Sequence, residues 1–190
     1  MNSARKAKVA VSKQKKEPKS DLEIVAEIVH SAGGKIVGRT RLQKIGYLLH
    51  AAGFEDSFSF EYRHYGPYSE GFSAAIHNAA ILDFIDEVEK EANWGGTYSI
   101  YKVSSSLNAT EKKTAKVAFI REAASADPVE LELAATAAFL ASREGLQEGA
   151  WEETQARKPE KAQGNRLENA KALYQKLAAI QSPNKLPAIV

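Results

Sequence analysis

The sequence contains no cysteine, which excludes a disulfide framework and any metal site built on thiolates. It also lacks a run of about 20 apolar residues, the length that a membrane-spanning helix needs. Its basic beginning is not followed by the apolar core of a signal peptide. We therefore expect a soluble protein, and a cytoplasmic location is the simplest expectation for a chain without cysteine.

Charge is distributed unevenly along the chain. The net charge of +2 divides into +6 over residues 1–20 and −4 over the remainder. We expect residues 1–19 to form a basic, disordered arm, which either contacts the phosphates of nucleic acid or serves only as a solvated terminus. The lysines proposed for nucleic-acid contact are Lys13, Lys15, Lys16 and Lys19.

Two short amphipathic helices are predicted after the arm. Ser20 and Glu23 have the spacing of a capping box, and apolar residues follow at helical spacing as far as Gly33. The second helix covers residues 40–52 and is closed by Gly53. Basic residues cluster at the beginning of this second helix. They are Arg39, Arg41 and Lys44.

An aromatic stretch follows these helices. Apolar and polar residues alternate over residues 58–65, which predicts a strand with one buried face. Gly66 and Pro67 are predicted to end that strand, because proline lacks a ladder donor and restricts the residue before it. Ser69 can then cap a helix over residues 70–80. The stretch is therefore predicted to be an elbow between a strand and a helix.

After residue 80, the residue pattern predicts a hairpin followed only by helices. The expected fold class is α+β and mostly helical, a helical domain with a small antiparallel sheet or hairpin, and the order is compatible with a winged-helix-like arrangement. One globular domain is expected over residues 20–181, followed by a tail over 182–190 that covers the surface or frays. The hairpin strands are predicted near 81–88 and 97–103, and the helices over about 110–124, 128–144, near 151 and over 165–181.

Sequence patterns that carry catalysis or metal binding are missing. The four histidines lie in separate predicted elements without HExxH spacing, and no serine lies in a G-x-S-x-G elbow. The run Gly33-Gly34-Lys35 lacks the remaining spacing of a phosphate loop. We therefore expect no catalytic residue, no cofactor and no metal, and a protein that is not an enzyme.

Two motifs resemble a known family. One is the helix GRTRLQKIGYLL, residues 38–49, and the other is the stretch YRHYGPYS, residues 62–69. Together they are similar to YwgA-type proteins and, more distantly, to the Panacea or SocA-like antitoxin domain. The resemblance extends over about residues 20–181, and Ile45 stands where a leucine is usual.

The resemblance implies a non-enzymatic protein-interaction or regulatory module of antitoxin type. SocA-like relatives bind and neutralise a toxin, so the implied partner is a protein, such as a toxin encoded nearby. The alternative is a DNA-binding winged-helix regulator that uses the basic arm and the hairpin. Basic and tyrosine side chains are the candidates for partner contact, and the alternative for each is a solvated or intramolecular role. They are Arg39, Arg41, Lys44, Arg63, Tyr65 and Tyr68.

Overall fold

The computed structural model describes residues 19–93, 95–104 and 114–190. Lys13, Lys15 and Lys16, and the beginning predicted for a helix near residue 110, lie outside this part of the chain. The described part is mostly helical with small antiparallel sheets, which confirms the expected α+β class. The helices are α1 (Asp21–Ser31), α2 (Arg39–Ala51), α3 (Glu70–Ile81), α4 (Ala115–Ser125), α5 (Pro128–Arg143), α6 (Ala150–Arg157) and α7 (Arg166–Ala179). The strands are β1 (Lys35–Val37), β2 (Glu61–Arg63), β3 (Gly66–Tyr68), β4 (Ile85–Glu91) and β5 (Thr97–Val103).

Side-chain caps fix where several helices begin, as the sequence predicts. Ser20 and Glu23 form the complete capping box of α1, in which the Ser20 amide donates to Glu23 Oε2 at 2.8 Å. The Phe72 amide donates to Ser69 Oγ at 3.1 Å at the first turn of α3. Asp127 caps α5 by accepting from two backbone amides, ahead of a proline in the first turn. The structure thus confirms these three predicted beginnings.

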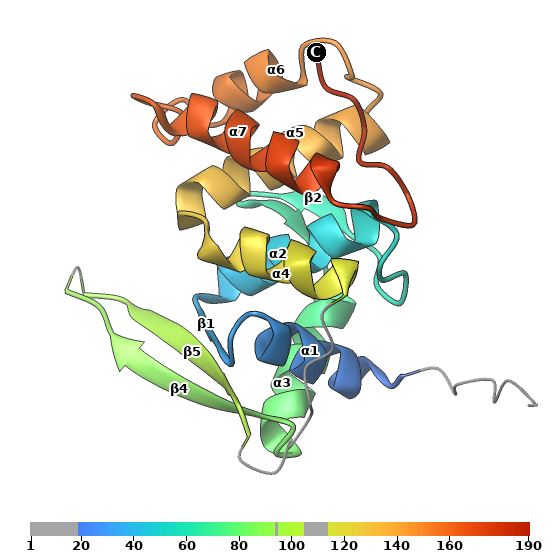
Figure 1. Ribbon diagram of the computed structural model, residues 1–190. Coiled ribbons are helices and arrows are strands. Elements are labelled where there is room, and N and C mark those ends of the chain that lie inside the picture. Colours follow the sequence, from blue (N-terminus) through green and yellow to red (C-terminus); the bar gives the residue numbers. More distant parts are fainter. Residues whose placement is uncertain (1–18, 94, 105–113) are drawn as a thin grey trace, which may run out of the picture.

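The larger sheet has the strand order β1-β5-β4, with both pairs antiparallel. Along the chain, α1, β1, α2, α3 and the β4–β5 hairpin follow one another in the order of a winged helix. The β2–β3 hairpin is inserted between α2 and α3. In Figure 1 the β4–β5 hairpin lies at the lower left, far from α6 and α7 at the top.

The prediction that the strand ends at Gly66 and Pro67 is wrong. These two residues begin β3, which pairs with β2 across a two-residue turn. Pro67 lies opposite Tyr62, the middle of three opposed pairs. Opposed pairs in an antiparallel ladder alternate between hydrogen-bonded and non-bonded, and a non-bonded position needs no amide from proline. The stretch is therefore a hairpin that leads into α3.

The core is centred on α5 and α2. Every residue of α5 from Leu131 to Ala141 is buried. A helix buried all round is typical of the centre of a domain. The C-terminal tail packs back over the surface, where Leu186 is buried and the Asn184 amide donates to the Ala52 carbonyl at 3.0 Å. Within the described residues, we find no helix whose length and apolar character would suit a bilayer crossing.

Candidate functional site

The two motifs singled out in the sequence lie in direct contact. The side-chain amide of Gln43, in the first half of α2, forms two hydrogen bonds with the backbone of Ser69. Gln43 Nε2 donates to the Ser69 carbonyl at 3.1 Å, and the Ser69 amide donates to Gln43 Oε1 at 3.0 Å. Both residues are buried. The glutamine therefore satisfies backbone groups that would otherwise lack partners in the interior.

Lys44 is buried beneath the β2–β3 hairpin. Its side chain is directed at β3, where Nζ donates to the Pro67 carbonyl at 2.7 Å. Only 1% of this lysine is exposed to solvent, and burial lowers its pKa to about 7, against a smaller opposing effect of the nearby Glu132 carboxylate. Lys44 therefore acts as an internal support for the hairpin backbone.

A second internal support comes from Glu132 on α5. Its carboxylate accepts hydrogen bonds from Lys158 Nζ and Lys161 Nζ, each at 2.7 Å. Lys158 Nζ also donates to the carbonyl of His64 in the hairpin turn at 3.3 Å. Glu132 and Lys158 are both buried, so the pair is held in a medium of low polarity. The carboxylate thus links α5, the segment after α6 and the turn.

Gly66 allows this packing at the hairpin. Its φ of +81° lies in the left-handed region, which side-chain-bearing residues rarely adopt. A Cβ at this position would lie 2.7 Å from Thr136 Oγ1 on α5, closer than real Cβ contacts allow. The close approach of the hairpin to α5 therefore requires glycine here.

The tip of the hairpin faces solvent above these supports. Tyr65 is 56% exposed, and its ring lies in edge contact with His64. Lys161 Nζ lies 4.9 Å from the centre of the Tyr65 ring. The same ammonium binds Glu132, so one lysine joins the buried carboxylate to the exposed tyrosine.

Arginines cover the other two tyrosines of the hairpin. The Arg63 guanidinium lies 5.3 Å from the centre of the Tyr68 ring and forms an ion pair with Glu70 at 2.8 Å. Arg157 lies 4.9 Å from the centre of the Tyr62 ring. Cations over aromatic rings contribute about 0.5–1 kcal/mol each at exposed sites. The hairpin therefore presents a surface of tyrosine and cationic side chains.

The remaining candidates occupy different surroundings. Arg41 donates to the Ala124 carbonyl at the end of α4, and desolvation lowers its pKa. Arg39 is on the surface beside β4, and a hydrogen bond with Tyr101 raises its pKa. Lys19 forms an ion pair with Glu27 at 2.6 Å. The structure brings Lys44, Arg63, Tyr65 and Tyr68 together at one hairpin and places Arg41 and Lys19 elsewhere. Arg39 is not part of the hairpin, but it lines a cavity together with Tyr68.

Four residues that support the hairpin from beneath were not recognised in the sequence as parts of the site. A usable signal existed for Glu132, because it is the only charged residue between Leu131 and Ser142. A lone charge in so apolar a run predicts a buried partner of opposite sign. The other three had no comparable signal, because they lie in polar surroundings in the sequence. They are Gln43, Lys158 and Lys161.

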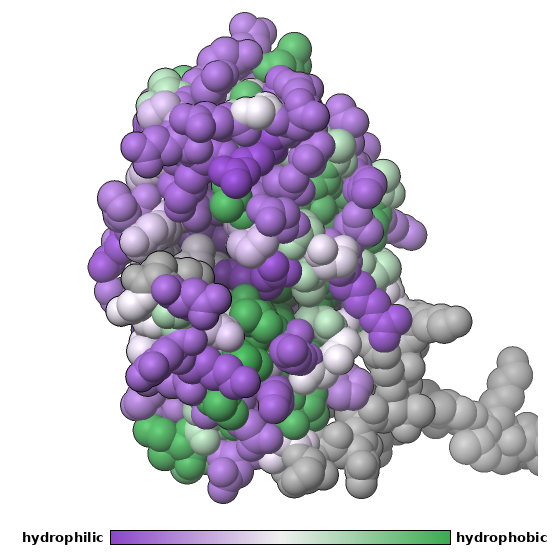
Figure 2. Space-filling view, turned by 90° about the vertical axis from the view of Figure 1, so that its left-hand side faces the viewer, coloured by the Kyte–Doolittle hydropathy of each residue, from purple (hydrophilic) through white to green (hydrophobic). Residues whose placement is uncertain are grey.

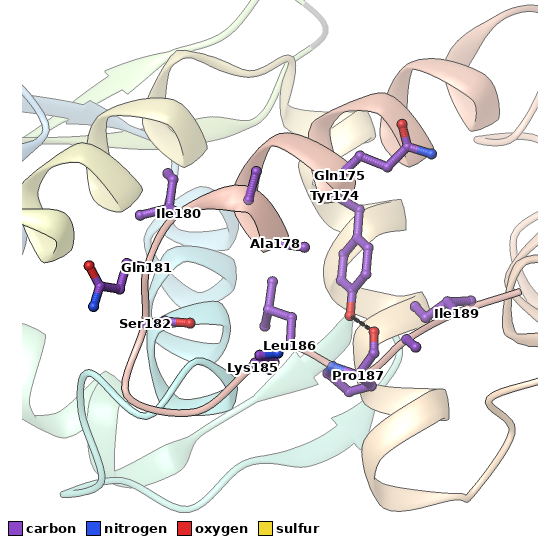
Figure 3. A pocket seen from close by; sticks show the side chains of 12 residues that line it. Tyr174, Gln175, Ala178, Ile180, Gln181, Ser182, Lys185, Leu186, Pro187 and Ile189 are labelled. Atoms are coloured by element: carbon purple, nitrogen blue, oxygen red, sulfur yellow. Dashed lines mark hydrogen bonds between the residues drawn. The ribbon is translucent and has the colours of Figure 1, made fainter.

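Several cavities, among them the following two, lie away from the hairpin turn. One, of about 530 Å³, lies between the end of α7 and the tail, where Tyr174 Oη donates to the Pro187 carbonyl (Figure 3). A second, of about 280 Å³, lies beside Arg39, Glu87 and His77. The described residues form no cluster of histidine and carboxylate side chains suited to a metal. Lys44 lines neither cavity.

A comparison with known proteins finds similarity over part of the chain. The chain is 34% identical over 76 residues to the uncharacterized protein YwgA of Bacillus subtilis (strain 168). The match covers 40% of this chain and 44% of YwgA, so the chain matches less than half of that relative's length. No family model matches the chain. Similarity to YwgA is therefore established for part of the chain.

Proposed function

We propose that the chain is a non-enzymatic protein-interaction module of antitoxin type, which binds and neutralises or regulates a partner protein. The observation that carries this proposal is the combination of an exposed tip and a fixed base in the β2–β3 hairpin. Tyr65 and Arg63 are exposed, while the backbone beneath them is bonded to buried side chains of α2 and to Lys158. The resemblance of both motifs to the SocA-like domain supports the antitoxin class.

A hairpin that is fixed before binding loses little conformational freedom when a partner arrives. Tyrosine and arginine are also the side chains that most often dominate interface energies. Arg41 and Lys44 serve in this proposal as internal residues, and the contact surface consists of Arg63, Tyr65 and the exposed part of Tyr68.

The test is co-expression of the chain with the product of the neighbouring gene, followed by affinity capture and a growth assay. The double variant Arg63→Ala, Tyr65→Ala should weaken capture by about ten-fold or more. Its free energy of unfolding should change by no more than about 1 kcal/mol, because both side chains are largely exposed.

The matched control changes two exposed apolar residues at the far end of α3. Ile81 and Leu82 are 62% and 58% exposed. The variant Ile81→Ala, Leu82→Ala should retain capture. If the wild-type chain gives neither a complex nor rescue of growth, the proposal loses its support. If both double variants weaken capture equally, the hairpin is not the contact surface.

A second candidate is a DNA-binding regulator, which the winged-helix order of elements favours. The charge of the expected contact elements opposes it, because α3, β4 and β5 together carry five carboxylates and two lysines. The phosphate contacts would then depend on the basic arm. This candidate predicts salt-sensitive retardation of DNA that weakens when residues 1–19 are removed. Absence of binding even at low salt would count decisively against it.

A further inference from the structure

The β4–β5 hairpin ends the larger sheet with an unpaired edge. In the strand order β1-β5-β4, no other strand among the described residues pairs with the outer side of β4. This strand is seven residues long, or about 23 Å at the usual rise per residue. Figure 2 views the molecule from the side on which this hairpin lies and shows a mainly hydrophilic surface with apolar areas in its lower half.

The backbone pattern identifies which residues of β4 have free groups at this edge. The Ala92 amide donates to the Gly96 carbonyl at 2.7 Å, one position beyond the opposed pair of Glu91 and Thr97. Bonded and non-bonded pairs alternate along an antiparallel ladder. On the other side of β5, the Gly38 amide donates to the Ser99 carbonyl, which agrees with this alternation. Residues 85, 87, 89 and 91 therefore direct their amides and carbonyls to the outer side of β4, where Ile85 is buried and residues 87, 89 and 91 are accessible.

Three of these four residues are glutamates, and their side chains share one face of the sheet. Arg39 is their nearest cation, but it lies 3.7 Å from Glu87 and 3.9 Å from Glu89, beyond hydrogen-bond distance. The Glu89 side chain is 63% exposed, and Glu91 has no ion pair among the described residues. The free backbone groups and the available carboxylates thus occur on the same residues.

This charge pattern restricts what can pair with the edge. Two copies of β4 would bring glutamates opposite glutamates, and like charges directly opposite are destabilising. A phosphate backbone would be repelled for the same reason. A strand with a lysine or arginine at every second position would place each cation beside a glutamate, and its intervening side chains would share the face of Val88, which is 39% exposed.

We propose that the free edge of β4 binds an extended, basic segment of a partner protein, which adds to the sheet as a further strand. Backbone hydrogen bonds to residues 87, 89 and 91 supply affinity, and cations opposite Glu87, Glu89 and Glu91 supply specificity. The inference rests on the proposed function, because it names the chemistry of the partner that such a module captures.

The test uses a fluorescent nonapeptide in which lysine alternates with threonine, measured by fluorescence anisotropy with the full chain. The same peptide with glutamine at every lysine should bind about ten-fold more weakly. The same peptide with N-methylated lysine amides should also lose binding, because those amides face β4. Equal affinity of the N-methylated peptide would overturn strand addition.

Substitutions in β4 test the same binding mode in the protein rather than in the peptide. Glu87→Gln with Glu89→Gln should weaken the lysine peptide about five-fold, while Glu148→Gln with Glu152→Gln, an equal change of charge at exposed positions elsewhere, should leave affinity within about two-fold. Glu89→Pro should abolish binding without removing a β4–β5 hydrogen bond, since its amide faces outward. Equal weakening by both glutamine pairs would reduce the effect to general charge attraction and overturn the proposal.

Two further measurements distinguish peptide binding at β4 from partner capture by the β2–β3 hairpin and from binding of the chain's own basic arm. The variant Arg63→Ala, Tyr65→Ala should bind the peptide normally, so failure to capture a partner and failure to bind the peptide can be distinguished. Deletion of residues 1–18 should leave peptide affinity unchanged. If the deletion instead tightens binding about five-fold or more, the chain's own basic arm competes for the edge, and the assignment to a partner is overturned.

Discussion

The two hairpins of this protein carry similar charge groups in opposite surroundings. Beside β2–β3, one carboxylate, Glu132, binds two lysines at 2.7 Å, and its side chain is 5% exposed. Beside β4–β5, one guanidinium, Arg39, lies 3.7 and 3.9 Å from two glutamates, and its side chain is 58% exposed. The number of charges is the same, but the central charge of the first group is shielded from water and that of the second is not.

This difference explains how each hairpin can serve a partner. Breaking a buried charge group leaves an uncompensated charge in the interior, so the β2–β3 hairpin is held in one position. An exposed group contributes little to stability because water and salt screen it. The glutamates of β4 therefore remain available to another molecule, while the tip of β2–β3 is a rigid surface on a fixed base.

The substitution Glu132→Gln is expected to have the largest effect on stability. This change leaves Lys158 buried without its carboxylate, and we expect the free energy of unfolding to fall by about 3–5 kcal/mol. Urea denaturation followed by circular dichroism measures it. The control is Glu168→Gln, which removes an exposed pair with Lys171 and should change stability by less than about 0.5 kcal/mol. Similar losses in both variants would contradict the assigned role of burial.

The next effect concerns the approach of the hairpin to α5. Gly66→Ala combines a left-handed φ with a contact 2.7 Å from Thr136 Oγ1, so we expect a loss of about 2–4 kcal/mol in thermal or urea unfolding. Gly145→Ala is the matched control, because its φ is +72° with no atom within 4 Å of the added Cβ. It should cost only the strain, about 1 kcal/mol. An equal loss of stability in both variants would mean that α5 shifts to accommodate the added methyl group, so that the close approach does not require glycine.

Much of the fold could be predicted from local sequence signals. Ser20, Ser69 and Asp127 are at the caps that their side chains predict, and the helical segments follow the spacing of apolar residues. The β3 strand was missed because proline normally argues against a strand, and only its position opposite Tyr62 removes that objection. Local rules state a preference, and the partner strand decides whether it applies.

The candidate site could be predicted only in part. The hairpin residues were found because they form a dense aromatic motif, whereas their supports come from distant segments. Lys158 bonds the His64 carbonyl across 94 positions of the chain and Glu132 across 26. No periodic pattern reports such contacts, since they depend on how α5, α6 and the hairpin pack. Lys44 shows the same limit: basic residues at a helix start suggest a surface, but this one is buried.

The pH dependence of stability tests the lowered pKa of the buried Lys44. The pKa of Lys44 in the folded protein, about 7, lies below its ordinary value of 10.5, so the unfolded chain binds more protons between these values. Stability should therefore rise with pH in this window, and Lys44 should contribute an increase of about 2 kcal/mol between pH 7 and pH 9. Lys44→Met should remove that increase. The comparison of both proteins by urea denaturation at the two pH values excludes effects of other groups. An unchanged slope in the variant would contradict the shifted pKa.

The smallest expected effect comes from the exposed group. Arg39→Gln removes the cation beside Glu87 and Glu89 and its hydrogen bonds with Ser99 and Tyr101, and because the arginine side chain is 58% exposed we expect a loss of stability below about 1 kcal/mol. The same change leaves both glutamates without a cation, so affinity for the lysine peptide should rise while stability barely moves. Unfolding and peptide anisotropy on one sample measure both. A loss above about 2 kcal/mol would place Arg39 in the same structural role as Glu132, and the distinction between a fixed hairpin and an open one would fail.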